Sequence, residues 1–450
     1  MGTADPARVA VVGCGHVGLV MAAGLAELGH DVHGIDRDEG LVEALQAGVV
    51  RLEEPDLPEL VRKGVASGHL CFTSSYPKAI EAAQFVFLAV DTPQTLAGAA
   101  DLRNIRSATR SIANALNGVN PIIINKSTSP IGTGETIESI LELALERKHH
   151  LPRIAANPEF LRQGRAVHDF FNPDRIVVGA RVEDDARSVA NLYAGLPGEV
   201  ILTDLRTAEM IKYVANSFLA TRISFINEIA RLCEQIGVDV ERVVEGISLD
   251  PRVGRHFFHP GIGYGGSCLP KDVAALRYIG ETFGVATPVL SAVQEVNTAQ
   301  RTGAVRRLRA RLGTLEGKAI GVWGLTFKAG TEDTRESPAM DVVGLLRNEG
   351  AHVQLFDPSV SDHAERLPEN LRTHLRTTPL EAAIGADALA ILTDWPQFCD
   401  VPLHEVRGVM RGNVVFDGRN LLSRDAVEAA GLAYIGVGRT ATAHRRRRTD

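Results

Sequence analysis

The chain has 450 residues, of which 45% are hydrophobic and 23% are charged, and its formal net charge is −7. This length exceeds that of one ordinary core, so we expect two or three domains. The composition is that of a soluble globular protein without a membrane-spanning segment, and the negative charge argues against general binding of nucleic acids.

The N-terminus and the cysteines bear on the compartment. The first residues lack the basic-then-apolar layout of a secretory signal, so we expect a cytoplasmic protein. The five cysteines are widely spaced and include no CxxC pair; they are Cys14, Cys71, Cys233, Cys268 and Cys399. This pattern argues against a disulfide framework and a structural zinc site, and no metal site is expected.

In chain order, the first predicted elements alternate between strand and helix. Residues 9–13 form a short β-branched run, and residues 17–28 have helical apolar spacing that ends at Gly29. Further strands are expected at residues 32–35, 85–90, 122–124 and 175–179. The alternation predicts a parallel sheet with crossover helices, in an α/β domain of residues 1–206.

A helical region and a second α/β pattern follow. Residues 207–235 contain no Gly or Pro and predict a long connecting helix, within a helical middle domain of residues 207–312. A strand followed by glycine begins at residue 318, and more strands are expected at residues 353–356, 388–392 and 414–417. They predict a smaller α/β domain of residues 313–440, whose strand-then-glycine start suggests an internal duplication. The basic residues 441–450 are expected to form a disordered tail.

A glycine-rich turn follows the first strand and opens the first helix. Gly13, Gly15 and Gly18 have the G-x-G-x-x-G spacing of a dinucleotide site, which also includes His16 and Val17. Such glycines let the backbone turn sharply and approach a pyrophosphate at the positive end of the helix dipole.

The acid after the second strand bears on which dinucleotide binds. Asp36 is placed to accept hydrogen bonds from ribose hydroxyls and to repel a 2′-phosphate. The pattern therefore predicts NAD rather than NADP, although the neighbouring Arg37 could partly accommodate that phosphate.

A second glycine-rich segment, residues 261–266, precedes Cys268. Pro270 suits the first turn of a helix, so Cys268 is expected at or just before a helix N-terminus. There the helix dipole, together with Lys271 if it lies close, would stabilise a thiolate and make Cys268 a nucleophile. Asp272 is expected on the same face, where it could order a water or act as a base. The other four cysteines are interpreted as small buried hydrophobic residues.

Taken together, these motifs resemble the UDP-glucose/GDP-mannose dehydrogenase family over nearly the whole chain. The matching segments are the glycine fingerprint and residues 90–93, 101–102, 126–128, 157–161, 174–179, 212–216, 265–272, 327–328, 334–338 and 417–419. The resemblance implies an α/β fold with two Rossmann-like doubly wound parallel-sheet domains, joined by a helical middle domain with a long connecting helix. It implies that the middle domain carries the dimer contact and the cysteine loop, and that the C-terminal domain binds the nucleotide sugar.

The resemblance also implies a reaction. Two successive hydride transfers from sugar C6 to two NAD molecules would pass through a thiohemiacetal and a thioester on Cys268. Lys212 and Asn216, one helical turn apart, resemble the groups that stabilise oxygen charge at C6.

Three further residues resemble the hydrolytic machinery of the family. Asp272 and Thr128 resemble a pair that positions the catalytic water, and Glu159 resembles a carboxylate that assists thioester hydrolysis. The chain departs from the family at Gln163, where an acid is common.

Other matching positions resemble ligand contacts. The positions that resemble NAD contacts are Thr92, Thr128 and Arg335. Those that resemble nucleotide-sugar contacts are Glu159, Phe160, Leu161, Lys212, Asn216, Tyr264, Gly265, Lys328 and Arg419. Arg252 resembles an arginine delivered to the substrate of a neighbouring subunit, which implies at least a homodimer.

The choice of substrate follows from short motifs. Gly-Gly-Ser-Cys at residues 265–268 and Arg-Val-Gly at residues 252–254 favour UDP-glucose, which would be oxidised to UDP-glucuronate. The same chemistry on dTDP-glucose, GDP-mannose or a UDP-N-acetylhexosamine is an alternative. Two other classes stay open: a two-electron hydroxyacid or sugar-phosphate dehydrogenase, and a non-catalytic protein that binds NAD and a nucleotide sugar.

Overall fold

A computed structural model describes residues 5–95, 98–145, 152–361 and 363–439. The chain divides into two compact units, Met1–Ala215 with Ala274–Thr282 and Asn216–Val273 with Phe283–Asp450. The predicted disordered tail, residues 441–450, lies outside the described residues.

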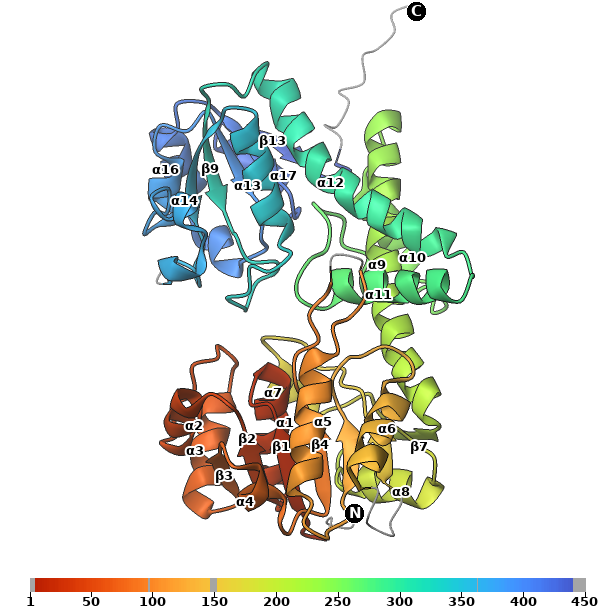
Figure 1. The fold of residues 1–450 in the computed structure, drawn as a ribbon. Coiled ribbons are helices and arrows are strands. Elements are labelled where there is room, and N and C mark those ends of the chain that lie inside the picture. The colour runs from red at the N-terminus through yellow and green to blue at the C-terminus, as the bar shows by residue number, and fades with distance from the viewer. Residues whose placement is uncertain (1–4, 96–97, 146–151, 362, 440–450) are drawn as a thin grey trace, which may run out of the picture. The chain divides into compact units, whose positions relative to one another are not determined.

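The first unit contains an eight-stranded sheet (Figure 1). The strands are β1 (Arg8–Val12), β2 (Asp31–Ile35), β3 (Leu70–Thr73), β4 (Phe85–Leu88), β5 (Ile122–Asn125), β6 (Arg153–Ala156), β7 (Arg175–Ala180) and β8 (Glu199–Thr203). Their spatial order is β3-β2-β1-β4-β5-β6-β7-β8, and every neighbouring pair is parallel except β6 with β7. The strands expected in this unit are confirmed, whereas β3, β6 and β8 were not predicted.

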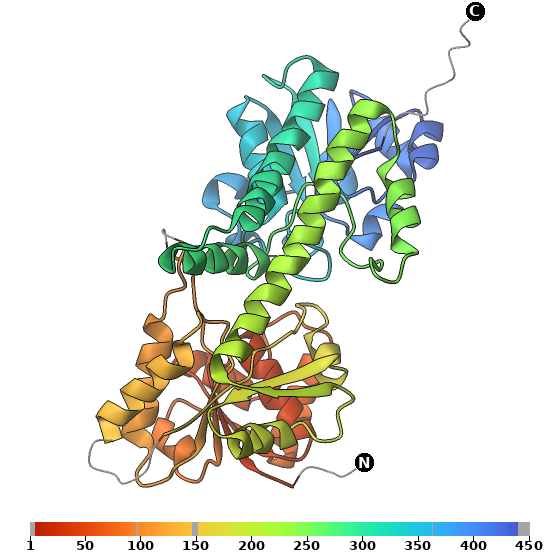
Figure 2. The ribbon, with the colours of Figure 1, turned by 90° about the vertical axis from the view of Figure 1, so that its right-hand side faces the viewer.

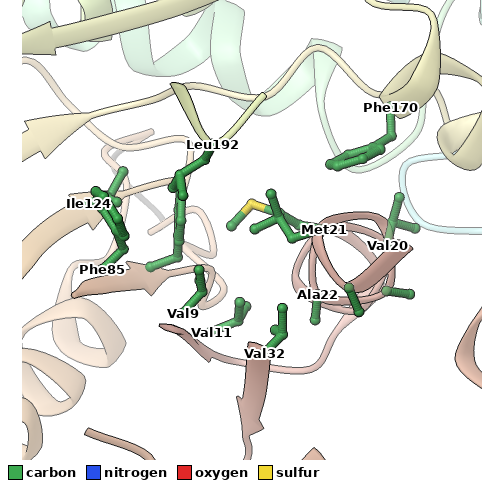
Figure 3. Packing of buried hydrophobic residues seen from close by; sticks show 14 of the residues in the cluster. Val9, Val11, Val20, Met21, Ala22, Val32, Phe85, Ile124, Phe170 and Leu192 are labelled. Carbon is green, nitrogen blue, oxygen red and sulfur yellow. The ribbon is translucent and has the colours of Figure 1, made fainter. Parts of the chain in front are cut away.

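Both faces of this sheet are buried, because alternate side chains of a strand point to opposite faces. On β1, Val9 and Val11 pack in one cluster, while Ala10 and Val12 pack in another. Figure 3 shows the first cluster, with Met21 of α1 among the buried residues. The helices that contribute side chains to this cluster are α1 (His16–Glu27), α2 (Glu39–Gln46), α3 (Leu57–Ser67), α7 (Ala166–Phe171) and α8 (Glu183–Asn191). The other face is covered by α4 (Tyr76–Ile80), α5 (Arg103–Ala115) and α6 (Thr133–Leu145).

The long helix predicted for residues 207–235 is confirmed as α9 (Leu205–Ile236), which Figure 2 shows as a single helix. The division into two units falls within it, after Ala215. The helices that follow are α10 (Val240–Ser248), α11 (Leu269–Thr282) and α12 (Pro288–Leu312). None of the described helices combines the length and apolar character that a membrane crossing requires.

The second unit contains a five-stranded parallel sheet in the order β10-β9-β11-β12-β13. The strands are β9 (Ala319–Trp323), β10 (His352–Phe356), β11 (Ala388–Ile391), β12 (Val414–Asp417) and β13 (Ala433–Gly436). Of these, only β13 was not predicted. Helices α12, α13 (Pro338–Asn348) and α14 (Glu369–Arg372) pack on one face, and α15 (Pro379–Ala383), α16 (Leu403–Val409) and α17 (Arg424–Ala429) on the other. The expected fold class is thus confirmed, with one antiparallel strand pair in the first sheet.

The two sheets repeat one local arrangement. In the first, the Cys14 N–H donates to Asp36 Oδ2 at 2.8 Å; in the second, the Leu325 N–H donates to Asp357 Oδ2 at 2.7 Å. In each case the aspartate follows the second strand and holds the turn after the first, which supports the internal duplication. The copies have diverged, because Asp357 is fully buried and also accepts from Trp395, whereas Asp36 is half-buried.

Candidate functional site

The glycine fingerprint lies at the point where the first sheet reverses its strand order, between β1 and β4. Ligands of open α/β sheets bind at the carboxyl ends of the strands at such a point. A Cβ on Gly18 would lie 1.8 Å from the carbonyl oxygen of Gly13, so Gly18 is required for packing. A Cβ on Gly15 would meet nothing within 4 Å, so the backbone there is open to a ligand at the N-terminus of α1.

Asp36 directly follows β2 and faces the fingerprint. Its Oδ2 accepts from the Cys14 N–H, and its Oδ1 accepts from the Asp38 N–H at 3.1 Å. These bonds orient the carboxylate beside the fingerprint, while the neighbouring Arg37 is exposed. Burial, together with the charge of Asp36, raises the pKa of the Cys14 thiol, so Cys14 stays a neutral packing residue.

The interpretation of the other cysteines as buried is only partly right. Cys14 and Cys233 are buried, but Cys71 is half-buried and Cys399 is exposed. Cys71 lies on the edge strand β3, and Cys399 lies in the short helical segment Pro396–Asp400.

His16 begins α1, and its Nε2 hydrogen-bonds to Glu54 Oε2 at 2.7 Å. Glu54 is buried and also accepts from the N–H groups of Gly164 and Ala166, at 2.8 and 2.7 Å. It therefore ties the start of α1 to the start of α7. The sequence offered no signal for this role. Val17, also in the first turn of α1, is half-buried.

The loops after β4 and β5 meet beside the fingerprint. Thr92 is buried and donates its Oγ1 hydrogen to the carbonyl of Thr128 at 2.6 Å. Ser127 donates its hydroxyl to the carbonyl of Val90 at 2.7 Å. Two of the residues expected to contact NAD are therefore joined directly, at the carboxyl edge of the sheet.

Glu159 and Lys212 form a buried ion pair of 2.8 Å within the first unit. Glu159 Oε2 also accepts from the Leu161 N–H at 2.6 Å. Burial alone would raise the pKa of Glu159, but the ammonium of Lys212 holds it below its usual value. The Phe160 ring lies 5.4 Å from Lys212 Nζ and 3.8 Å from the guanidinium carbon of Arg175. The structure thus brings together four predicted substrate residues of this unit.

A second buried lysine, Lys126, lies within the matched segment of residues 126–128. Lys126 Nζ donates to Asn157 Oδ1 at 2.9 Å, and Asn157 Oδ1 also accepts from the Tyr193 hydroxyl at 2.6 Å. Burial lowers the pKa of Lys126 to about 7, against the opposing effect of Glu159. The matched segment of residues 126–128 was the available signal, but its lysine was assigned no role.

In the second unit, Cys268 directly precedes α11 and is exposed, as expected for a residue at a helix N-terminus. Its carbonyl accepts from the Asp272 N–H at 2.9 Å, and its Sγ lies 3.7 Å from the Ser267 hydroxyl. The side chain is therefore accessible to a substrate, at a place where the helix dipole favours a thiolate.

Asp272 is fully buried and accepts two short hydrogen bonds. Asn216 Nδ2 donates to Oδ2 and Lys271 Nζ donates to Oδ1, both at 2.6 Å. The Lys271 ammonium, which the sequence offered as a partner for the thiolate, thus neutralises the buried carboxylate. Asp272 and Asn216, predicted separately, are hydrogen-bonded to each other, and Asp272 lies in the first turn of the helix that Cys268 precedes.

Side-chain amides hold the glycine loop that leads to Cys268. Asn297, on α12, accepts from the Tyr264 N–H at 2.8 Å and donates to its carbonyl at 3.0 Å. Asn227, on α9, accepts from the Gly261 N–H at 2.8 Å. Burial raises the pKa of Tyr264 to about 12. A Cβ on Gly265 would lie 2.1 Å from the carbonyl oxygen of Glu336, so glycine is required there. Nothing in the sequence pattern had identified the amides.

The remaining predicted residues lie in separate loops of the second unit. Arg419 donates to the carbonyls of Leu392, Gly263 and Phe327, and so braces the glycine loop. Lys328 Nζ lies 5.7 Å from the centroid of the Phe327 ring. Arg335 pairs with Asp333 at 2.7 Å, and the exposed Arg252 pairs with Asp250 at 2.6 Å.

Known protein families and relatives match this chain over most of its length. Three family models match: the NAD binding domain of the UDP-glucose/GDP-mannose dehydrogenase family over residues 7–197, its central domain over 206–299 and its UDP binding domain over 321–424. A UDP-glucose 6-dehydrogenase of Bacillus subtilis is 41% identical over 435 residues, covering 96% of this chain and 94% of that protein. One from Pseudomonas aeruginosa is 39% identical, covering 97% and 98%.

A solved structure agrees with these matches. The UDP-glucose dehydrogenase from the hyperthermophilic archaeon Pyrobaculum islandicum has a TM-score of 0.89 and 37% identity, covering 97% of this chain and 98% of that one. The chain therefore belongs to the UDP-glucose/GDP-mannose dehydrogenase family.

Proposed function

We propose that this chain is an NAD-dependent dehydrogenase that converts UDP-glucose, two NAD⁺ and water to UDP-glucuronate and two NADH, with release of protons. The observation that carries the proposal is the 41% identity to a UDP-glucose 6-dehydrogenase over 96% of the chain. The exposed Cys268 at the start of α11 agrees with it, because the reaction needs an accessible nucleophile.

The first unit holds the cofactor in this proposal. The open backbone at Gly15 fits a pyrophosphate, and Asp36 faces the position of the adenosine ribose. We also assign His16, Val17, Arg37, Thr92 and Thr128 of this unit to the cofactor, together with Arg335, which resembles a cofactor contact of the family. When bound, NAD would supply the hydride acceptor for each of the two oxidations at C6 of the sugar.

Cys268 carries the sugar between the two oxidations. Its thiolate adds to the C6 aldehyde, so that a carbon–sulfur bond forms and the carbonyl oxygen takes a proton. The thiohemiacetal then loses a hydride from C6 and the proton from its hydroxyl group, which leaves a thioester. Water then breaks the carbon–sulfur bond and releases a carboxylate and the thiol. Holding the aldehyde covalently prevents its loss to solvent.

The surrounding polar groups handle charge and protons. Lys212 and Asn216 stabilise the negative charge that develops on the C6 oxygen. Asp272 with Thr128 positions the hydrolytic water, and Glu159, ionised beside Lys212, assists its attack.

In this proposal the nucleotide sugar is recognised by residues from several loops. Phe160 and Leu161 follow β6, and Tyr264 and Gly265 lie in the loop held by Asn297. Lys328 and Arg419 supply positive charge for the diphosphate.

The enzyme acts as at least a homodimer in this proposal. The C-terminal part of α9 exposes a row of apolar side chains on one face: Phe218, Phe225, Leu232 and Ile236 are 59%, 51%, 54% and 62% exposed. Such a row suits an isologous contact with a second copy, and the dimer would deliver Arg252 to its neighbour's substrate. We place the enzyme in the cytoplasm, which keeps a catalytic thiol reduced.

An NADH-yield assay tests the function. Limiting UDP-glucose, dTDP-glucose, UDP-N-acetylglucosamine and GDP-mannose are each incubated with excess NAD and the purified chain. The proposal expects two NADH per UDP-glucose and the highest kcat/KM for that substrate. One NADH per sugar would indicate a two-electron dehydrogenase, and no NADH with any sugar would indicate a binding protein.

A further inference from the structure

Polar side chains connect two loops at the carboxyl edge of the first sheet. We refer to residues 126–134, after β5, as the β5 loop, and to residues 157–161, after β6, as the β6 loop. Lys126 of the β5 loop donates to Asn157 of the β6 loop at 2.9 Å, and both side chains are buried. The start of the β5 loop is therefore fixed to the β6 loop.

Helix α9 is linked to each of these loops by a buried charge. Lys212 pairs with Glu159 of the β6 loop at 2.8 Å. Glu209, almost one turn earlier on α9, accepts from the N–H groups of Gly132 and Gly134 at 2.7 and 2.8 Å. These bonds cap α6 and fix the end of the β5 loop to α9. The β5 loop, the β6 loop and α9 are therefore each bonded to the other two.

We propose that Glu209 is a positioning residue that holds the β5 loop, and with it Thr128, in the conformation that binds NAD. The inference rests on the proposed function in taking Thr128 as a cofactor residue. Thr128 lies in the middle of the loop, and its carbonyl accepts from Thr92 Oγ1 at 2.6 Å. A shift of the loop would therefore disturb both side chains expected beside the cofactor.

The geometry calls for an ionised carboxylate. Glu209 uses both oxygens as acceptors at once; an amide in its place would set its NH2 group against one of the N–H groups, and in a protonated carboxyl the hydroxyl oxygen is the weaker acceptor. The side chain is 5% exposed, and burial raises its pKa to about 7, although the two backbone N–H groups lower it. Of the charges around it, Glu135 on α6 raises this pKa and Arg206 on α9 lowers it, and Arg181 lies near both.

A pH dependence of NAD affinity follows. Below pH 7 most Glu209 side chains are protonated, and one of the two N–H groups then faces a weaker acceptor, the hydroxyl oxygen. Because the two backbone N–H groups lower the pKa of Glu209, losing them favours the protonated form, so the loop is held more firmly and NAD binds more tightly at pH 8 than at pH 6.

Calorimetric titration of the full chain with NAD, without sugar, tests this inference. We expect Glu209→Gln to weaken NAD binding at pH 8 by about tenfold and to abolish the difference between pH 6 and pH 8. The matched control is Glu138→Gln, on α6, the helix that Glu209 caps. The Glu138 carboxylate pairs with the Arg181 guanidinium at 2.6 Å, and its replacement should leave both values unchanged. If Glu209→Gln binds NAD with the wild-type affinity and pH dependence, the inference is wrong.

A second variant leaves all bonds of Glu209 intact. Glu135→Gln removes the carboxylate that raises the Glu209 pKa, so the midpoint of the pH dependence should move to lower pH. An unmoved midpoint would contradict the assignment to Glu209, even if Glu209→Gln does not fold. Because the titration uses no sugar, a chain that shows this behaviour but gives no NADH from UDP-glucose would refute the proposed function and leave this inference standing.

Discussion

Asn216 and Asp272 are bonded to each other at 2.6 Å, although 56 residues separate them in the sequence. The bond joins α9 to the first turn of α11, within one helical turn of Cys268. Because Asp272 is fully buried, its carboxylate depends on Asn216 and Lys271 for compensation.

The first prediction concerns this bond. We expect Asn216→Ala to lower kcat by about 100-fold, since a donor to the developing oxygen charge is lost and Asp272 loses a partner. The free energy of unfolding should also fall by about 1–3 kcal/mol, because the buried Asp272 carboxylate loses a hydrogen-bond donor. Steady-state kinetics and urea denaturation measure both. Asn348→Ala, at an exposed site on α13, is the control. Wild-type kcat in Asn216→Ala would remove Asn216 from the mechanism.

The second prediction compares two glycines of the fingerprint. Gly15→Ala should fold with nearly wild-type stability, because its Cβ would meet no atom within 4 Å, but should lose most NAD affinity because the methyl group occupies the path of the pyrophosphate. Gly18→Ala should be strongly destabilised, because its Cβ would lie 1.8 Å from a carbonyl oxygen. Thermal denaturation and NAD titration separate the two effects. Equal NAD affinity in Gly15→Ala and the wild type would mean that the pyrophosphate lies elsewhere.

The third prediction concerns the nucleophile. Cys268→Ser should lower steady-state turnover by on the order of a thousandfold or more, since a serine oxygen is rarely ionised at neutral pH. The defect should lie in the second oxidation or in hydrolysis, which rapid mixing with UDP-glucose would reveal as early NADH formation followed by a stall. Cys399→Ser, at the other exposed cysteine, should behave like the wild type. Normal turnover by Cys268→Ala would falsify covalent catalysis.

The fourth prediction concerns the buried ion pair. Glu159→Gln leaves the Lys212 charge buried without its counterion and should cost about 3–5 kcal/mol at pH 7. Because the folded-state pKa of Glu159 lies below 4.5, the pair contributes its full stability above pH 4.5 and loses it as the pH falls through the lower, folded value. The difference between the wild type and the variant should therefore shrink in acid. The double variant Glu159→Gln with Lys212→Met should recover part of the loss at pH 7, and a double variant no more stable than the single one would argue against the pairing.

The fifth prediction concerns cofactor choice. Asp36→Asn removes the charge that repels a 2′-phosphate but keeps an acceptor for the Cys14 N–H. We expect the ratio of kcat/KM for NAD to that for NADP to fall by about tenfold, equivalent to about 1.4 kcal/mol. Asp38→Asn, which keeps its capping bond to the Leu41 N–H, should leave the ratio unchanged. If the wild type used both cofactors equally well, Asp36 would not be the selecting residue.

The sequence alone was sufficient where the determining residues are neighbours in the chain. The turn at Gly13, the helix that starts after Cys268 and the length of α9 follow from glycine spacing, a proline in the first turn and an unbroken helical pattern. These features depend on local backbone geometry, which nearby side chains decide. The family motifs also located most of the proposed site.

Only the tertiary structure could decide which side chains meet and which are buried. The Glu54 carboxylate accepts from the Gly164 N–H, which lies 110 residues away in the sequence. Arg419 donates to the carbonyl of Gly263, which lies 156 residues away. The pKa values of Lys126 and Glu209 lie near 7 because folding removes both groups from water. Burial depends on elements far apart in the chain, so no local pattern could show it.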